Sequence, residues 1–235
     1  LRRCNDNCIG FSSLKVSAII LAAGSGSRFG EKKQFKQLKG VELYKYSLNK
    51  FLNCSLINEI VLAVPESRLA DVKIQIESIK ALKNILVVSG GPSRQVSVKN
   101  SVSAVSQHSD LVCIHDSARP FISDALIKQS INACLSNDGA IVAIPNYDTI
   151  KTCVSGYVEK TIDRNNTWMA QTPQVFWKTK LLKAIDFSEK NNATTTDESS
   201  MMESLDFQIS VVKGNANNFK ITFPEDWERA SNLVI

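Results

Sequence analysis

Short apolar runs recur along the chain, and the stretches between them place hydrophobic residues at helical spacing. Each run has the length of one buried strand. Runs that are continuously apolar, rather than alternating, are typical of parallel strands covered on both faces. The runs lie at 16–23, 59–64, 84–89, 110–115 and 139–144.

Four of the intervening stretches carry apolar residues three or four positions apart, as on one face of a helix. Strands that alternate with amphipathic helices predict βαβ units. We therefore expect an α/β fold, with a Rossmann-like, mostly parallel sheet and helices on both faces. Ligands of such sheets bind at the carboxyl ends of the strands. The spaced positions are Leu43, Tyr46, Ser47 and Phe51; Leu69, Val72, Ile76 and Ile79; Val98, Val102 and Val105; and Leu126, Ile127, Ile131 and Leu135.

The alternation stops after Pro145. Two β-rich runs flank Ser155 and Gly156, which favours a hairpin. An isolated hairpin is marginally stable in water, so we expect a projecting β-arm at about 146–168 that packs on a partner. Helices and a last strand should return from about Lys178, which completes a single domain over 16–235.

The first fifteen residues show no hydrophobic periodicity, and the given sequence begins with Leu. We treat 1–15 as an uncertain N-terminal extension: an alternative start, a cloning scar or a remnant of a targeting segment. The expected compartment is the cytoplasm, or a plastid if the extension is such a remnant.

Composition excludes several classes of function. The 235 residues carry a formal net charge of +5, and no Lys/Arg block contains interleaved aromatic residues, so we expect no nucleic-acid partner. No apolar run approaches the ~20 residues of a membrane span. The six cysteines form neither a CxxC pair nor a disulfide framework, which predicts buried thiols in a reducing compartment. Two histidines make a zinc site or a Ser/His triad improbable.

The stretch "LAAGSGSRFGEKKQF" follows the first apolar run and is typical of a phosphate-binding loop. A Walker A loop does not fit, because Glu31 follows a misplaced glycine. A dinucleotide fingerprint is one residue too long at Gly24, Gly26 and Gly30, and the acidic residue after the second strand lies about twice as far away as the ~20 residues expected. A plain turn does not account for the cations that follow.

The remaining alternative is a loop that wraps a triphosphate with its backbone N–H groups. Arg28, Lys32 and Lys33 lie just beyond the glycines. Arg offers a planar fork and Lys a point charge, and both neutralise charge that builds on a departing pyrophosphate.

Six segments in order resemble the family of 2-C-methyl-D-erythritol 4-phosphate cytidylyltransferases. They are "LAAGSGSRFG…KKQF", "GGPSRQVSV", "HDSARPF", "DRNNTWMAQTPQ", "TTTDESS" and "NNFKITFPEDW", and the resemblance covers about 16–233. Ribitol-5-phosphate cytidylyltransferases share some of them, and "HDSARP", "DRN" and "TDE" together favour the erythritol family. More distantly, a dinucleotide-binding oxidoreductase stays an alternative.

The resemblance implies a nucleotidyltransferase-type fold and a reaction. CTP and the polyol phosphate methylerythritol phosphate give the cytidine diphosphate alcohol and pyrophosphate, with Mg²⁺ as cofactor, in isoprenoid precursor biosynthesis. A phosphate monoester is largely dianionic near neutral pH, its second pKa being about 6, so it attacks without a general base. Positioning and charge neutralisation then suffice.

The resemblance also implies site residues. Arg28 and Lys33 stabilise the α-phosphate and the leaving pyrophosphate, although Lys32 stands where the family has proline. Arg164 and Thr149 grip the polyol phosphate across a homodimer interface made by the arm, and Lys220 orients that phosphate. The loop that wraps the triphosphate is Ala22, Ala23, Gly24, Ser25 and Gly26; the nucleotide contacts are Gly91, Arg94, Ser97, Ala118 and Arg119; Asp116 holds Mg²⁺ or the ribose; and Thr196 lies near the substrate.

Overall fold

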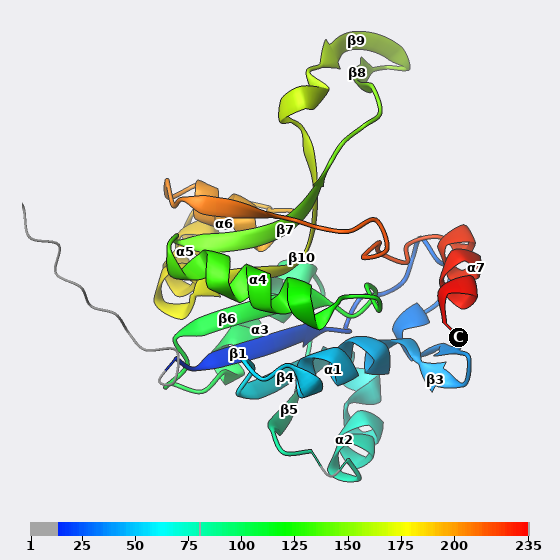
Figure 1. The fold of residues 1–235 in the computed structure, drawn as a ribbon, viewed down its shortest axis with the longest axis vertical. Coiled ribbons are helices and arrows are strands. Elements are labelled where there is room, and N and C mark those ends of the chain that lie inside the picture. The colour runs from blue at the N-terminus through cyan, green and yellow to red at the C-terminus, as the bar shows by residue number, and fades with distance from the viewer. Residues whose placement is uncertain (1–13, 80, 235) are drawn as a thin grey trace, which may run out of the picture.

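A seven-stranded sheet forms the centre of the protein, as a computed structural model describes it for residues 14–79 and 81–234 (Figure 1). Its strand order is β11-β7-β10-β6-β1-β4-β5. Only β10 runs antiparallel to its neighbours. The strands are β1 (Val16–Leu21), β4 (Glu59–Val64), β5 (Asn84–Ser89), β6 (Leu111–Asp116), β7 (Gly139–Pro145), β10 (Trp168–Trp177) and β11 (Ile209–Lys213).

Helices cover both faces of the sheet, as predicted. Alternate residues of a strand supply the two cores: Ile20 of β1 packs in one cluster and Ile19 in the other. The first cluster contains side chains of α1, α2 and α4, and the second those of α3, α5 and α6. The helices are α1 (Leu43–Asn53), α2 (Leu69–Glu77), α3 (Arg94–Ala104), α4 (Asp124–Leu135), α5 (Lys178–Lys190), α6 (Glu198–Glu203) and α7 (Pro224–Leu233).

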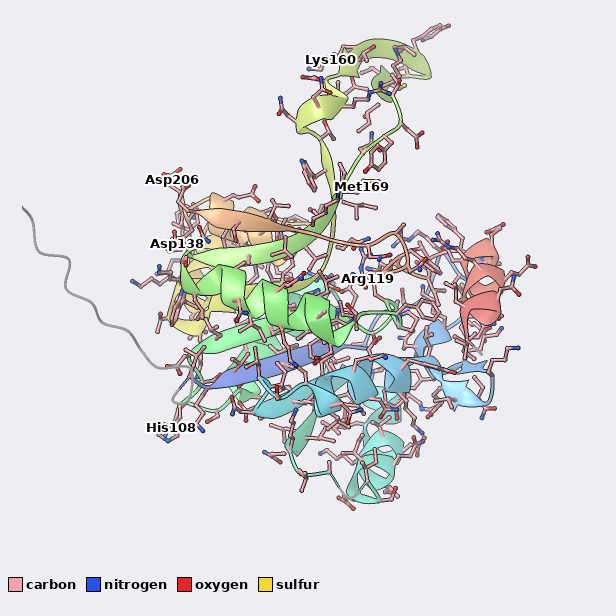
Figure 2. The ribbon with its side chains drawn as sticks, viewed as in Figure 1. His108, Arg119, Asp138, Lys160, Met169 and Asp206 are labelled. Atoms are coloured by element: carbon pink, nitrogen blue, oxygen red, sulfur yellow. The ribbon has the colours of Figure 1, made fainter. Side chains whose placement is uncertain are left out.

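The predicted arm is present as a separate two-stranded sheet. Strands β8 (Ile150–Val154) and β9 (Tyr157–Ile162) pair antiparallel, and the turn residues Ser155 and Gly156 both have positive φ. Figure 1 shows this hairpin projecting from the body above β7 and β10. Lys160 lies on the arm and Met169 at its base (Figure 2).

Strand β10 is the strand of the central sheet that the hydrophobic pattern did not predict. Its central residues Gln171, Thr172 and Gln174 are polar yet buried, and Pro173 lies among them. The register with β7 shifts between Ala170 and Gln174, where a proline is tolerated because ladder pairing is interrupted there.

A small lobe closes the end of the sheet that carries the glycine loop. The hairpin of β2 (Gln37–Leu38) and β3 (Val41–Glu42) packs with α7 through a third cluster that contains Leu38, Leu43 and Ile221. Phe29 also contacts Trp227 of α7, with ring centroids 5.6 Å apart. The C-terminal helix thereby covers the exit of the glycine loop.

One sequence expectation, the burial of the cysteines, changes here. Cys54, Cys113 and Cys134 are buried as expected, but Cys153 is exposed on β8, because the arm has no core in which to bury it. Cys4, Cys8 and residues 1–13 of the expected extension lie outside the described residues. Among the described helices, none combines the length and the apolar composition that a membrane span requires.

Candidate active site

Three predicted segments meet at the carboxyl ends of β1, β5 and β6. The Ala22 N–H donates to the Ala63 carbonyl at 2.8 Å, and the Gly90 N–H donates to the Val64 carbonyl at 2.8 Å, so the first two loops leave the sheet side by side. The third follows Asp116, the last residue of β6. These are the ends at which open α/β sheets bind ligands.

The glycine loop has a fixed shape and unused backbone donors. Gln34 donates from Nε2 to the carbonyls of Ala22 (2.9 Å) and Gly24 (2.5 Å). Gly26 has φ +73°, and a Cβ there would overlap the Glu31 carbonyl oxygen. Within the described chain, no hydrogen bond joins the amides of Gly24, Ser25 or Gly26 to another protein group. Free amides in a held loop form an anion-binding concavity.

Lys32 and Lys33 point to different surroundings. Lys32 is exposed, and its Nζ lies 3.3 Å from the Ser67 hydroxyl. Lys33 is buried, with its Nζ 5.4 Å from the centre of the Phe29 ring. Burial lowers the pKa of Lys33, and the charges of Lys220 and Arg28 lower it further. Lys33 therefore lies among the site's cations. This placement supports the assignment of the phosphate-binding role to Lys33 rather than to Lys32.

Asp116 lies between two cations that come from distant parts of the chain. Lys220 Nζ donates to Asp116 Oδ2 at 2.7 Å, and Arg94 Nε donates to Asp116 Oδ1 at 3.3 Å. Burial raises the pKa of Asp116, but Arg94 and Lys220 outweigh it and hold this pKa well below its ordinary value. Asp116 is therefore an anion whose charge is shared by two predicted site residues.

The residues present fit a magnesium ion only in part. Mg²⁺ is commonly held by one or two carboxylates together with substrate phosphates and water. Asp116 offers one carboxylate at the correct end of the sheet, and the protein cations already contact both of its oxygens. Within the described residues, no three His, Cys, Asp or Glu side chains gather as a metal cluster. Any Mg²⁺ held here must take most of its ligands from substrate phosphates and water.

Arg119 and Ala118 hold the segment that carries Lys220. The Ile221 N–H donates to the Ala118 carbonyl at 2.8 Å, and Arg119 Nη1 donates to the Asn218 carbonyl at 2.8 Å. Arg119 Nη2 also reaches the Ala170 carbonyl of β10, at 3.3 Å, and Figure 2 shows Arg119 beside the loop that leads to α7. In this structure the Arg119 guanidinium thus donates to backbone carbonyl groups of two other segments rather than facing open solvent.

The "GGPSRQVSV" segment forms a tight turn into α3. Ser93 is the N-cap and accepts from the Val96 N–H at 3.2 Å. The Gly91 N–H donates to Ser97 Oγ at 2.9 Å, and a Cβ at Gly91 would overlap the Val96 side chain. The hydroxyl of Ser97 is therefore used to close the turn, and Arg94 is placed on the first turn of the helix.

His115 has a structural role. It is fully buried, and its Nε2 lies 3.1 Å from the Arg119 carbonyl while its Nδ1 lies 3.0 Å from Thr172 Oγ1. Since Thr172 Oγ1 also accepts from the Asp116 N–H, its hydroxyl hydrogen is left for Nδ1. Burial lowers the pKa of His115 to about 4, so the ring is neutral at pH 7.

Three predicted residues do not join this cluster in a single chain. Thr149 and Arg164 are exposed at the arm, and Arg164 Nη1 donates to the Tyr147 carbonyl at 3.0 Å. No contact among the described residues joins either of them to Asp116 or Lys220. Thr196 is exposed in the loop before α6.

Sequence reasoning missed Glu198, Gln34 and Asn218. Glu198 is buried and accepts from Arg94 Nη1 at 2.5 Å. Asn218 donates from Nδ2 to the Thr172 carbonyl at 2.8 Å. Glu198 and Asn218 stand inside motifs that carried the resemblance, "TTTDESS" and "NNFKITFPEDW", and the acidic pair that opens a helix was the available signal for Glu198.

Comparison with known proteins identifies the family. The family model described as 2-C-methyl-D-erythritol 4-phosphate cytidylyltransferase matches residues 16–235. The chain belongs to this family. A relative with that name from Aquifex aeolicus is 40% identical over 220 residues, which cover 93% of this chain and 97% of the relative. One from Geotalea uraniireducens is 38% identical over 218 residues, with 91% and 94% covered.

A solved structure agrees with the family. The crystal structure of 4-diphosphocytidyl-2C-methyl-D-erythritol synthase from Anaerococcus prevotii has a TM-score of 0.85 and 30% identity, with 94% of this chain and 96% of that chain covered. The resemblance, the α/β fold and the assignment to the nucleotidyltransferase enzymes are therefore confirmed. The ribitol-5-phosphate and oxidoreductase alternatives are not favoured.

Proposed function

We propose that this chain transfers a cytidylyl group from CTP to 2-C-methyl-D-erythritol 4-phosphate, with release of pyrophosphate. Family membership supports the reaction. The observation that carries the proposal at the level of residues is a glycine loop with free amides beside the Arg28, Lys33 and Lys220 cations. That combination suits a polyanionic nucleotide and its leaving group.

Each group has a part in the transfer. The amides of Gly24 to Gly26 and the charges of Arg28 and Lys33 hold the triphosphate, and they stabilise the charge that builds on pyrophosphate as the α-phosphorus–oxygen bond breaks. Lys220 orients the polyol phosphate, whose oxygen forms the new bond to the α-phosphorus in line. No side chain accepts a proton, because the attacking monoester is already anionic.

The cofactor of this proposal is Mg²⁺. When bound, it neutralises phosphate charge, and Asp116 is the residue that would hold it. Since Arg94 and Lys220 contact the same carboxylate, the protein has cations of its own at this position.

The reaction is tested by pyrophosphate release. The protein is incubated with CTP, Mg²⁺ and either methylerythritol phosphate or ribitol 5-phosphate. Release only with methylerythritol phosphate supports the proposal. Release only with ribitol 5-phosphate, or binding of CTP without any release, contradicts it. Omitting Mg²⁺ from the active mixture tests the cofactor.

The proposal includes a homodimer formed through the arm. Among the described residues, the hairpin packs on no core of its own chain, yet it exposes large apolar side chains, including Tyr147 (74%) and Tyr157 (80%), together with Val154 and Val158. Such exposure on a projecting element favours a protein partner. A second copy would bring Thr149 and Arg164 to a site that a single chain leaves without them.

A mixing experiment tests the shared site. Arg28→Ala and Arg164→Ala chains are each expected to be nearly inactive, and each mixed dimer contains one site with neither substitution. Random mixing should restore about a quarter of wild-type activity. No restoration, or full activity of a monomer at the assay concentration, overturns the arm-mediated dimer.

A further inference from the structure

Glu198 is a buried carboxylate with a single hydrogen-bond partner among the described residues. Its side chain is 1% exposed, and its Oε1 accepts from Arg94 Nη1 at 2.5 Å. Its Oε2 is buried and has no hydrogen-bond partner among the described residues. Burying a carboxylate costs free energy unless the carboxylate is paired. The contact with Arg94 therefore offsets the cost of burying Glu198.

The place of Glu198 is fixed by its own helix. Asp197, the residue before it, caps α6 by accepting from the Ser200 N–H at 3.1 Å and also accepts from Gln174 Nε2 at 2.8 Å. The Ser199 N–H donates to Gln174 Oε1 at 3.2 Å. Strand β10 therefore holds the start of α6, and Glu198 reaches Arg94 from a rigid base.

Arg94 lies between two carboxylates. Its Nε contacts Asp116 and its Nη1 contacts Glu198, while its side chain is still 28% exposed at the ligand end of the sheet. Burial lowers the pKa of Arg94, but the charges of Asp116 and Glu198 more than offset this, so the pKa lies above its ordinary value. Four charges of alternating sign thus follow one another: Glu198, Arg94, Asp116 and Lys220.

We propose that Glu198 is a positioning residue that keeps Arg94 from closing on Asp116 with two N–H groups. A guanidinium and a carboxylate pair best side by side, through two parallel hydrogen bonds. With Glu198 on Nη1, Arg94 makes a single contact to Asp116 Oδ1, and Oδ2 stays on Lys220. Without Glu198, the Arg94 side chain rotates and pairs with both carboxylate oxygens of Asp116. This pairing displaces Lys220 from Oδ2 and moves the Arg94 guanidinium away from the nucleotide.

This role rests on the proposed function and on the expectation from the sequence that Arg94 contacts the nucleotide, and it is tested by CTP affinity rather than by turnover alone. Calorimetry compares wild type with Glu198→Gln, which keeps the size and the acceptor but removes the charge. The exposed Glu203 of the same helix gives the control, Glu203→Gln. Loss of a charged hydrogen bond predicts about tenfold weaker CTP binding for Glu198→Gln and no change for the control.

A double-mutant cycle separates positioning from plain stability. If Glu198 acts through Arg94, then Arg94→Gln combined with Glu198→Gln binds CTP no more weakly than Arg94→Gln alone. Losses that multiply overturn the proposal, as does an affinity of Glu198→Gln within about twofold of wild type. If wild type itself fails to bind CTP, it is the proposed function that fails.

A second variant, Arg94→Lys, tests the proposal if the Glu198→Gln protein does not fold. Arg94→Lys leaves a cation for Glu198, but its single ammonium lacks the fork that spans two carboxylates. It should lose about tenfold in CTP affinity when measured at a temperature at which thermal unfolding shows the variant to be folded. An affinity like that of wild type overturns the proposal.

Discussion

The ligand-binding end of the sheet and the arm differ in which side chains they bury and which they expose. At the sheet end, charged groups are paired, and they are buried or half-buried: Asp116 contacts Arg94 and Lys220, and Arg94 also contacts Glu198. On the arm, apolar side chains such as Tyr157 and Val158 are exposed. The first region pairs these charges within one chain, whereas the apolar side chains of the arm are not covered by the described residues of their own chain. Four predictions, in order of effect, test that difference.

The largest effect is expected for Lys33. In Lys33→Ala, a cation beside the leaving group is lost, and kcat should fall about 10²–10³-fold, as for removal of one preorganised donor. The neighbouring Lys32→Ala is the matched control, because Lys32 is exposed and contacts Ser67. Steady-state kinetics with CTP measures both. Equal losses in the two variants would show that the buried position of Lys33 has no catalytic meaning.

Acid should destabilise the body through His115. Burial lowers its pKa to about 4, below the ~6.5 of the unfolded chain. The unfolded state therefore binds the proton first, so the contribution is fully present above pH 6.5 and is lost as the pH falls towards 4. The free energy of unfolding should drop by about 3 kcal/mol over that interval.

Urea unfolding at several pH values measures this loss. His115→Gln removes the titrating ring and should flatten the dependence between pH 6.5 and 4. A variant that loses as much stability as wild type over this interval would contradict the assignment. The arm hairpin has no buried titrating group among its described residues and should contribute nothing to this dependence.

A pair of glycines tests whether the loop has a fixed shape. Gly26→Ala forces a side chain into a positive-φ position against the Glu31 carbonyl and should cost about 1–3 kcal/mol. Gly24→Ala meets no atom within 4 Å and lacks a positive φ, so stability should change little. Thermal unfolding of both variants provides the measurement. Equal melting temperatures would mean that the loop adapts freely.

The smallest effect on chain stability is expected on the arm. Val158→Ser should change the free energy of unfolding of the single chain by no more than about 0.5 kcal/mol, since the side chain is exposed. It should nevertheless weaken the proposed dimer in sedimentation experiments. Val98→Ser, in the core between α3 and the sheet, is the contrasting variant and should destabilise the chain strongly.

The sequence by itself determined the elements that depend on local pattern. The five apolar runs became β1, β4, β5, β6 and β7, with bounds close to those expected, because buried parallel strands need continuous apolar residues. The Ser155–Gly156 turn and the Ser93 cap were equally local. Strand β10 was missed because polar residues and Pro173 interrupt its pattern.

Only the tertiary structure decided how the charged groups pair. Lys32 and Lys33 are neighbours of the same type, and packing against Phe29 buries one and leaves the other exposed. Arg94 and Glu198 lie 104 positions apart, as do Asp116 and Lys220. Contacts at such separations follow from the order of strands in the sheet rather than from local spacing. The motifs therefore named most of the charged residues of the site, while the fold assigned their partners.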